Sequence, residues 1–135
     1  MRSSPITRTI IAAASLLIAA QALAVDADAL KETTPEERAE AQTSIMKEKL
    51  GLSAEKVVKV RAINLKYAEK LEPVLKGSDG PLMKGREAGN RQQQKEGELK
   101  AVLSPDEFKK YLELKPYIRE HGVERIYEER AKRGH

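Results

Sequence analysis

The chain has no cysteine and no tryptophan, contains a single phenylalanine, and has only 4% aromatic residues. Without cysteine it can form no disulfide bond and offers no thiol nucleophile or thiolate ligand, and an oxidising compartment does it no harm. Its two histidines, His121 and His135, do not form a His-x-x-x-His pair. A metal site would therefore need carboxylates from elsewhere, and we expect neither a metal ion nor any other cofactor.

Common catalytic and nucleotide-binding motifs are also missing. There is no Gly-x-Ser-x-Gly sequence, and neither Gly77 nor Gly80 is followed by the Lys-Ser/Thr pair of a phosphate-binding loop. Adjacent carboxylates such as Glu36 and Glu37 fit the first turn of a helix, where the helix dipole favours negative charge. We therefore expect that the protein is not an enzyme.

Residues 1–24 have the features of a cleavable export signal. Arg2 and Arg8 come first, residues 9–20 are almost wholly apolar, and Ala22-Leu23-Ala24 has the small-x-small pattern of a cleavage site. The apolar run is shorter than the ~20 residues that span a bilayer. We predict cleavage after Ala24, a periplasmic location in a Gram-negative bacterium, and no stable membrane insertion of the mature chain.

The charge distribution and the composition limit the kinds of partner that the protein is expected to bind. Loss of Arg2 and Arg8 with the signal would lower the formal net charge from +4 to +2. The remaining basic residues are interspersed with acidic ones, so nucleic acid is not an expected partner. Charged residues make up 34% of the chain, and large apolar side chains are too few for a thick core. We expect elongated helices that share apolar faces with a second copy in a homodimer.

The pattern predicts an all-α chain of about four helices, because no segment alternates polar and apolar residues over a strand's length. After a mobile leader at 25–33, residues 34–135 form one helical domain with a C-terminal tail that could be mobile. Thr34 precedes a first helix over 35–50, which Gly51 ends. A second helix follows Ser53 and ends near residue 76, with Pro73 expected to kink or shorten it.

The second half of the domain is less regular. A third helical segment spans about 82–103, and its polar middle at 90–96 predicts loose packing or an exposed arm. A fourth helix follows Ser104, and Pro116 is expected to interrupt it before a final amphipathic stretch.

Two helix starts repeat the same local pattern, Leu52-Ser53-Ala54-Glu55-Lys56 and Leu103-Ser104-Pro105-Asp106-Glu107. In each, a leucine precedes a serine that can cap a helix, and Glu107 can complete a capping box whereas Lys56 cannot. The order of helices and these motifs resemble the Spy/CpxP family, which is marked by two Leu-Thr-x-x-Gln motifs. Here serine replaces threonine in both motifs, and Lys56 and Glu107 stand where glutamine would be.

The resemblance implies a bent helical hairpin that pairs antiparallel with a second copy to form a thin, curved cradle. It also implies an ATP-independent periplasmic chaperone that binds unfolded or misfolded envelope proteins. Two alternatives stay open: an envelope-stress protein that modulates a sensor kinase, and a periplasmic metal-binding sensor. The candidate client-binding residues are the charged Lys59, Arg61, Lys66, Lys70, Arg86 and Arg91 and the apolar Met46, Leu65 and Met83.

Overall fold

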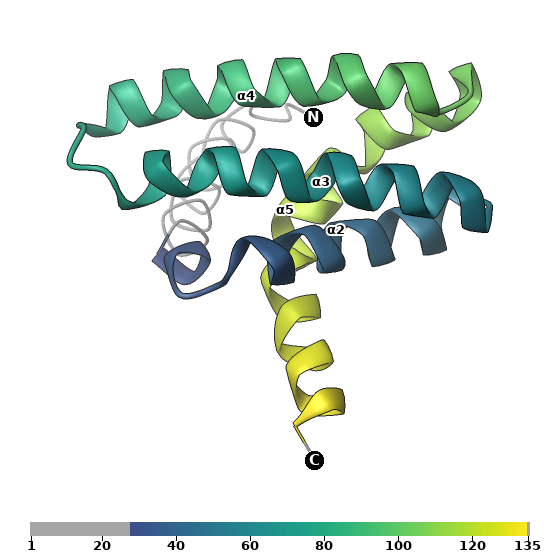
Figure 1. The fold of residues 1–135 in the computed structure, drawn as a ribbon, viewed down its shortest axis with the longest axis horizontal. Coiled ribbons are helices and arrows are strands. Elements are labelled where there is room, and N and C mark those ends of the chain that lie inside the picture. Colours follow the sequence, from purple (N-terminus) through teal and green to yellow (C-terminus); the bar gives the residue numbers. More distant parts are fainter. Residues whose placement is uncertain (1–27, 135) are drawn as a thin grey trace, which may run out of the picture.

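The computed structural model describes residues 28–134, and within this range it is all-α, as expected. Four long helices follow one another: α2 at Pro35–Leu50, α3 at Ala54–Lys76, α4 at Pro81–Val102 and α5 at Pro105–Arg133 (Figure 1). The predicted export signal lies outside the described residues, as do positions 25–27 of the predicted leader. The remainder of that leader contains a helical turn at 28–31 and the buried Thr33.

Three helices lie side by side, and the fourth crosses them. Figure 1 shows α4, α3 and α2 one beside the next in one layer, each antiparallel to its neighbour, with α5 passing behind at a steep angle. α3 packs against α2 on one side and α4 on the other, whereas α5 packs mainly against α2 and touches α4 at few positions. α4 therefore forms one edge of the layer.

Short polar motifs set the starts of three of these helices. The Thr34 hydroxyl accepts from the Glu37 backbone N–H at 3.1 Å, and the Glu37 carboxylate accepts from the Thr34 N–H at 3.0 Å. Ser104 and Glu107 form the same reciprocal pair at the start of α5, at 3.2 and 2.8 Å. Ser53 caps α3 with a single bond from the Lys56 N–H at 3.3 Å. Each cap satisfies amides that the helix itself leaves free.

The interruption expected at Pro116 is wrong, since α5 continues through it to Arg133. Likewise, α3 continues through Pro73 to its end at Lys76. Proline inside a helix removes one hydrogen bond and crowds the preceding turn, at a cost of about 3 kcal/mol. In α5 the buried Tyr111 and Ile126 lie on either side of Pro116, so tertiary packing on both sides opposes a break.

α4 is a continuous helix despite its three glycines and its polar middle. A Cβ atom added at Gly85, Gly89 or Gly97 would meet nothing within 4 Å, so no close approach requires glycine there. Only Lys95 and Leu99 are buried in this helix. The polar segment at 90–96 thus belongs to the packed layer and is not a separate arm.

The core lies where the two connections α2–α3 and α4–α5 meet. Leu52 and Leu103, the leucines of the two repeated motifs, are both buried in one apolar cluster. Beside them, the Lys56 ammonium donates to the Glu107 carboxylate at 2.6 Å. The other buried members of the cluster are Met46, Val57, Val60, Leu99 and Tyr111.

The pair between Lys56 and Glu107 joins positions that are 51 residues apart in the sequence. Hydrogen bonds from Lys56 and from the Ser104 backbone N–H hold the pKa of Glu107 below its usual value. One carboxylate therefore caps α5 and binds the start of α3. The two residues that stand at the glutamine position of the resembled motif thus form an ion pair with each other.

We expect Lys56 and Glu107 to be energetically coupled. In a double-mutant cycle with Lys56→Met and Glu107→Gln, the coupling free energy of unfolding at pH 7 should be about 1 kcal/mol, because both side chains are only partly exposed. The pKa of Glu107 is lowered in the folded state, so this stabilisation is present above the ordinary carboxyl pKa near 4.5. It should be lost as pH falls through the lower folded value.

The exposed helical pair Lys59 and Glu55 is a matched control, for which we expect a coupling of about 0.3 kcal/mol. Denaturant titrations of each cycle at pH 7 and pH 3 provide the measurement. Equal coupling in the two cycles would contradict a special role for the pair of Lys56 and Glu107.

Candidate functional site

The three predicted client-binding lysines share one side of α3. Lys59, Lys66 and Lys70 follow one another at spacings of seven and four residues, which places them on one helix face. All three are exposed. The Lys66 ammonium donates to Glu98 of α4 at 2.7 Å, and this carboxylate raises the pKa of Lys66. Lys66 and Lys70 also lie 5.4 and 5.0 Å from the centre of the Tyr67 ring.

Arg61 and Leu65 lie on another side of α3. Arg61 donates two hydrogen bonds to the Glu40 carboxylate of α2, at 3.1 and 3.2 Å. Leu65, one turn further along, is half-buried. The structure therefore divides the predicted α3 residues between the side next to α4 and the side next to α2.

The predicted residues of α4 differ in exposure. Met83 is 47% exposed and the neighbouring Leu82 is 77% exposed, and both lie in the first turn of the helix. Arg86 is exposed one turn later. Arg91 is half-buried and lies 3.7 Å from the Glu87 carboxylate. Apolar and basic groups thus occur together at the start of α4.

Met46 does not belong to this surface, because its side chain is fully buried in the core cluster. Its sulfur lies 3.7 Å from the Asn64 amide nitrogen of α3, in the contact between α2 and α3. A client could reach Met46 only if these two helices separated.

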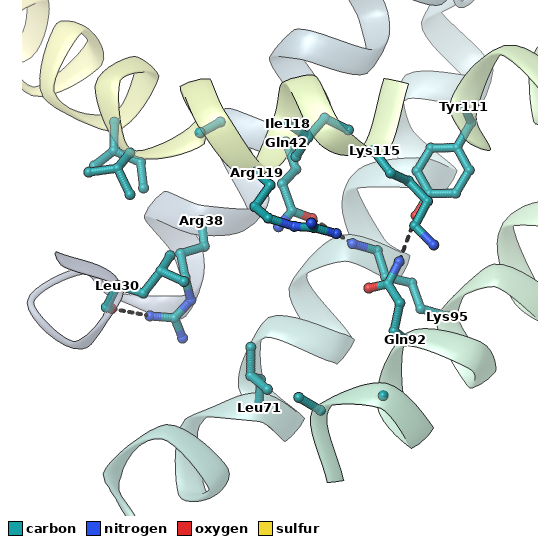
Figure 2. A pocket seen from close by; sticks show the side chains of 16 residues that line it. Leu30, Arg38, Gln42, Leu71, Gln92, Lys95, Tyr111, Lys115, Ile118 and Arg119 are labelled. Carbon is teal, nitrogen blue, oxygen red and sulfur yellow. Dashed lines mark hydrogen bonds between the residues drawn. The ribbon is translucent and has the colours of Figure 1, made fainter. Parts of the chain in front are cut away.

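A cavity of about 410 Å³ lies between α2, α3, α4 and α5 (Figure 2). Part of its wall is apolar and is formed by Leu30, Ala41, Leu71, Ala88, Ile118, Val123 and Ile126. Two of the lining residues, Gly89 and Arg119, are exposed. Every long helix contributes to its wall, so the cavity depends on how α5 crosses the other three.

Lys95 is the most unusual residue of this wall. Its side chain comes from α4, only 7% of it is exposed, and its ammonium donates to the Gln42 side-chain oxygen of α2 at 2.5 Å. Burial lowers the pKa of Lys95 to about 8, with the positive Lys115 contributing in the same direction. Figure 2 shows Lys95 directed into the space between the helices.

Glu96 supplies a carboxylate near Lys95, but other groups bind it. The Lys115 ammonium and the Gln92 side-chain amide donate to Glu96, the amide at 3.2 Å. Gln92 also donates to the Tyr111 hydroxyl at 3.1 Å, and burial raises the pKa of Tyr111 to about 12. This network ties α4 to the first half of α5.

Sequence reasoning did not identify Gln92 and Lys95, although a signal for them existed. They lie four and seven residues after Ala88, on the inward face that continues to Leu99. The polar composition of 90–96 concealed this spacing. Burial of a lysine is rare. Lys95 is enclosed only because α5 packs beside it, and the sequence alone does not predict that packing.

The remaining candidate chemistry is sparse in the part of the chain that the structure describes. The His121 ring donates from Nδ1 to the Glu124 carboxylate at 3.2 Å. Over residues 28–134 no group of three histidine, cysteine or acidic residues is arranged to hold a metal ion. None of the helices in that range is long and apolar enough to cross a membrane.

Comparison with known proteins shows that this chain matches the model of one protein family. Residues 20–111 match the family model described as a domain of unknown function, DUF4890. No curated protein and no solved structure matches the chain. The match includes α2, α3 and α4 and the start of α5.

We expect Lys95 to make stability depend on pH. Its folded pKa of about 8 lies below the ordinary value of 10.5, so the unfolded chain binds more protons between these values. The free energy of unfolding should therefore rise by about 2 kcal/mol from pH 7 to pH 9.5. Lys95→Met should remove this rise and should stabilise the protein at pH 7.

Lys100→Met is the matched control, since Lys100 is exposed on the same helix, and it should retain the rise. Denaturant titrations at both pH values test this, and comparison with Lys100→Met cancels the contribution of Tyr111, whose pKa burial raises. Parallel pH profiles for wild type and Lys95→Met would contradict the burial of a charged lysine.

Proposed function

The chain belongs to the DUF4890 family, and for this member we propose a periplasmic, ATP-independent chaperone-like function. The protein binds unfolded or misfolded polypeptides without catalysing a reaction. The observation that carries the proposal is the exposed mixture of apolar and basic side chains on α3 and α4. Val58 is 63% exposed next to Lys59, and Leu82 and Met83 are exposed close to Arg86.

This mixture suits weak binding of many sequences. Exposed apolar side chains gain from contact with the apolar segments of an unfolded client. Lysine and arginine attract its acidic residues at longer range and can cover apolar surface with their stems. Both effects are available without a preformed pocket for one sequence.

The lysines of α3 can exchange their present partners for a client. Lys59 pairs with Glu55 at 3.2 Å on the surface, and Lys66 pairs with Glu98 at 2.7 Å. Exposed ion pairs of this kind contribute little to stability, so a carboxylate of the client competes at little cost. Lys70 lies one turn beyond Lys66 on the same face.

α4 supports adaptable binding because it is held on one edge of the layer. Only two of its 22 residues are buried. Each of its interior glycines costs about 1 kcal/mol relative to alanine in a helix. The start of α4, where Leu82 and Met83 are exposed, can therefore shift while Leu99 near its end stays in the core.

The proposal includes an antiparallel homodimer of helical hairpins that forms a thin cradle. The exposed Tyr127 of α5, which the proposed client surface does not use, supports it, since large apolar groups on a thin layer gain from coverage by a second copy. A client would then contact the concave face of the pair. The resemblance to the Spy/CpxP family supplies the geometry of this part of the proposal.

We expect the protein, without nucleotide, to suppress aggregation of an unfolded acidic client such as reduced α-lactalbumin, measured by light scattering. Exchange of Lys59, Lys66 and Lys70 for glutamine should remove about half of this protection, and 0.5 M salt should weaken wild type similarly by screening. Leu82→Ser with Met83→Ser should also lower protection.

Two matched controls use α5. Lys109 and Lys110 are exposed lysines and Leu112 is an exposed leucine outside the proposed surface, so Lys109→Gln with Lys110→Gln, and Leu112→Ser, should leave protection near wild type. Absence of protection at an equimolar ratio of dimer to client overturns the proposal. Equal losses in the α5 controls would show that general charge or hydrophobicity, and not this surface, binds the client.

One measurement of the native mass of the exported protein tests both signal cleavage and dimerisation. When the full chain is produced in a Gram-negative host, native mass spectrometry of the periplasmic fraction should give twice the mass of a chain that begins at Val25. The physical reasons are signal cleavage after Ala24 and the shared apolar faces. Recovery only from the cytoplasm, or a monomer at micromolar concentration, would remove the corresponding part of the proposal.

A further inference from the structure

The cavity between the four helices is amphipathic, which distinguishes it from the exposed surface of α3 and α4. In Figure 2, Gln42, Gln92, Lys95 and Lys115 lie close to one another, whereas Leu71 lies apart from them. The apolar wall of the cavity also includes Ile118, Val123 and Ile126 of α5 and Ala88 of α4. The cavity thus has a polar, basic part and an apolar part.

The basic part carries more positive than negative charge. Lys115 is bound to Glu96, and Arg38, further along the wall, is bound to Glu72. Neither Lys95 nor Arg119 has a carboxylate within 4 Å among residues 28–134. Two cations of the wall are therefore left without a direct counter-charge from the described residues.

Lys95 also has unused hydrogen-bonding capacity. An ammonium group carries three donors, and the Lys95 ammonium makes a single hydrogen bond to the described residues, with Gln42. A buried charge with so few partners is costly. The lowered pKa of Lys95 expresses this cost, and a bound anion would reduce it.

We infer that this cavity binds a single-chain amphiphile with an anionic head, the head lying against Lys95 and Arg119 and the chain against the apolar wall. The volume of about 410 Å³ lies within the range of about 300–1,000 Å³ typical of small-molecule sites. It accommodates one small molecule and not a length of unfolded polypeptide. The inference is therefore independent of the proposed client surface.

The head group is an anion for a reason of geometry. The Glu96 carboxylate is turned to Lys115 and Gln92, so it is not free to bind a cationic ligand. Lys95 and Arg119 come from different helices, α4 and α5, and Figure 2 shows both reaching into the cavity. Carboxylate and monoalkyl phosphate heads share the required chemistry.

Calorimetric titration of the full chain tests the inference with two probes, decanoate and decyl phosphate, each below its micelle concentration. We expect one ligand per chain for at least one of them, and the probe that binds identifies the head group. Decyltrimethylammonium, with the opposite charge, and acetate, without the chain, should bind at least about tenfold more weakly. Binding of neither anionic probe, or equal binding of decyltrimethylammonium, overturns the inference.

Variants locate the site. Lys95→Met should weaken binding of the probe about tenfold or more, and Arg119→Gln, which changes an exposed side chain, about threefold. Lys100→Met and Lys109→Met change exposed lysines of the same two helices and should alter affinity less than twofold. Circular dichroism confirms that each variant is folded. Unchanged affinity in both Lys95→Met and Arg119→Gln would place any binding elsewhere and overturn the inference.

Discussion

The arrangement of the helices depends on the meeting of the two Leu-Ser turns at one end of the layer. Leu52 and Leu103 are buried in the same cluster, and Lys56 and Glu107 form an ion pair beside them. Because Glu107 also caps α5, the start of that helix is fixed with respect to the start of α3. Apolar burial supplies most of the stabilisation here, and the ion pair adds specificity of alignment.

This constraint explains why α5 crosses behind the layer. Its first residue, Pro105, directly follows the fixed turn, and its later residues must pack on α2, where Arg125 and Arg130 contact Glu48 and Glu37. A helix that runs between these anchors cannot also lie along the length of α4. The space left between α5 and the other helices is the cavity, which Figure 2 shows from close by.

The same geometry leaves α4 with two different faces. Its inward face contains Leu99 in the core and Lys95 in the cavity, whereas Leu82 and Met83 are exposed at its start. The inward face supports the inference of an amphiphile site, and the exposed start supports the proposed binding of unfolded chains. Both properties follow from an edge helix that packs fully on only one neighbour, α3.

Local sequence determined the helices and their starts. The capping residues Thr34, Ser53 and Ser104, together with apolar periodicity, predicted α2 and α3 almost to the residue, because these signals act within one helical turn. Tertiary structure decided the features that depend on residues more than one helical turn apart. Continuation of α5 through Pro116, burial of Met46 and Lys95, and pairing of Lys56 with Glu107 all depend on contacts between distant segments. Such contacts override local preference because the packing of several helices outweighs the cost of one unfavourable residue.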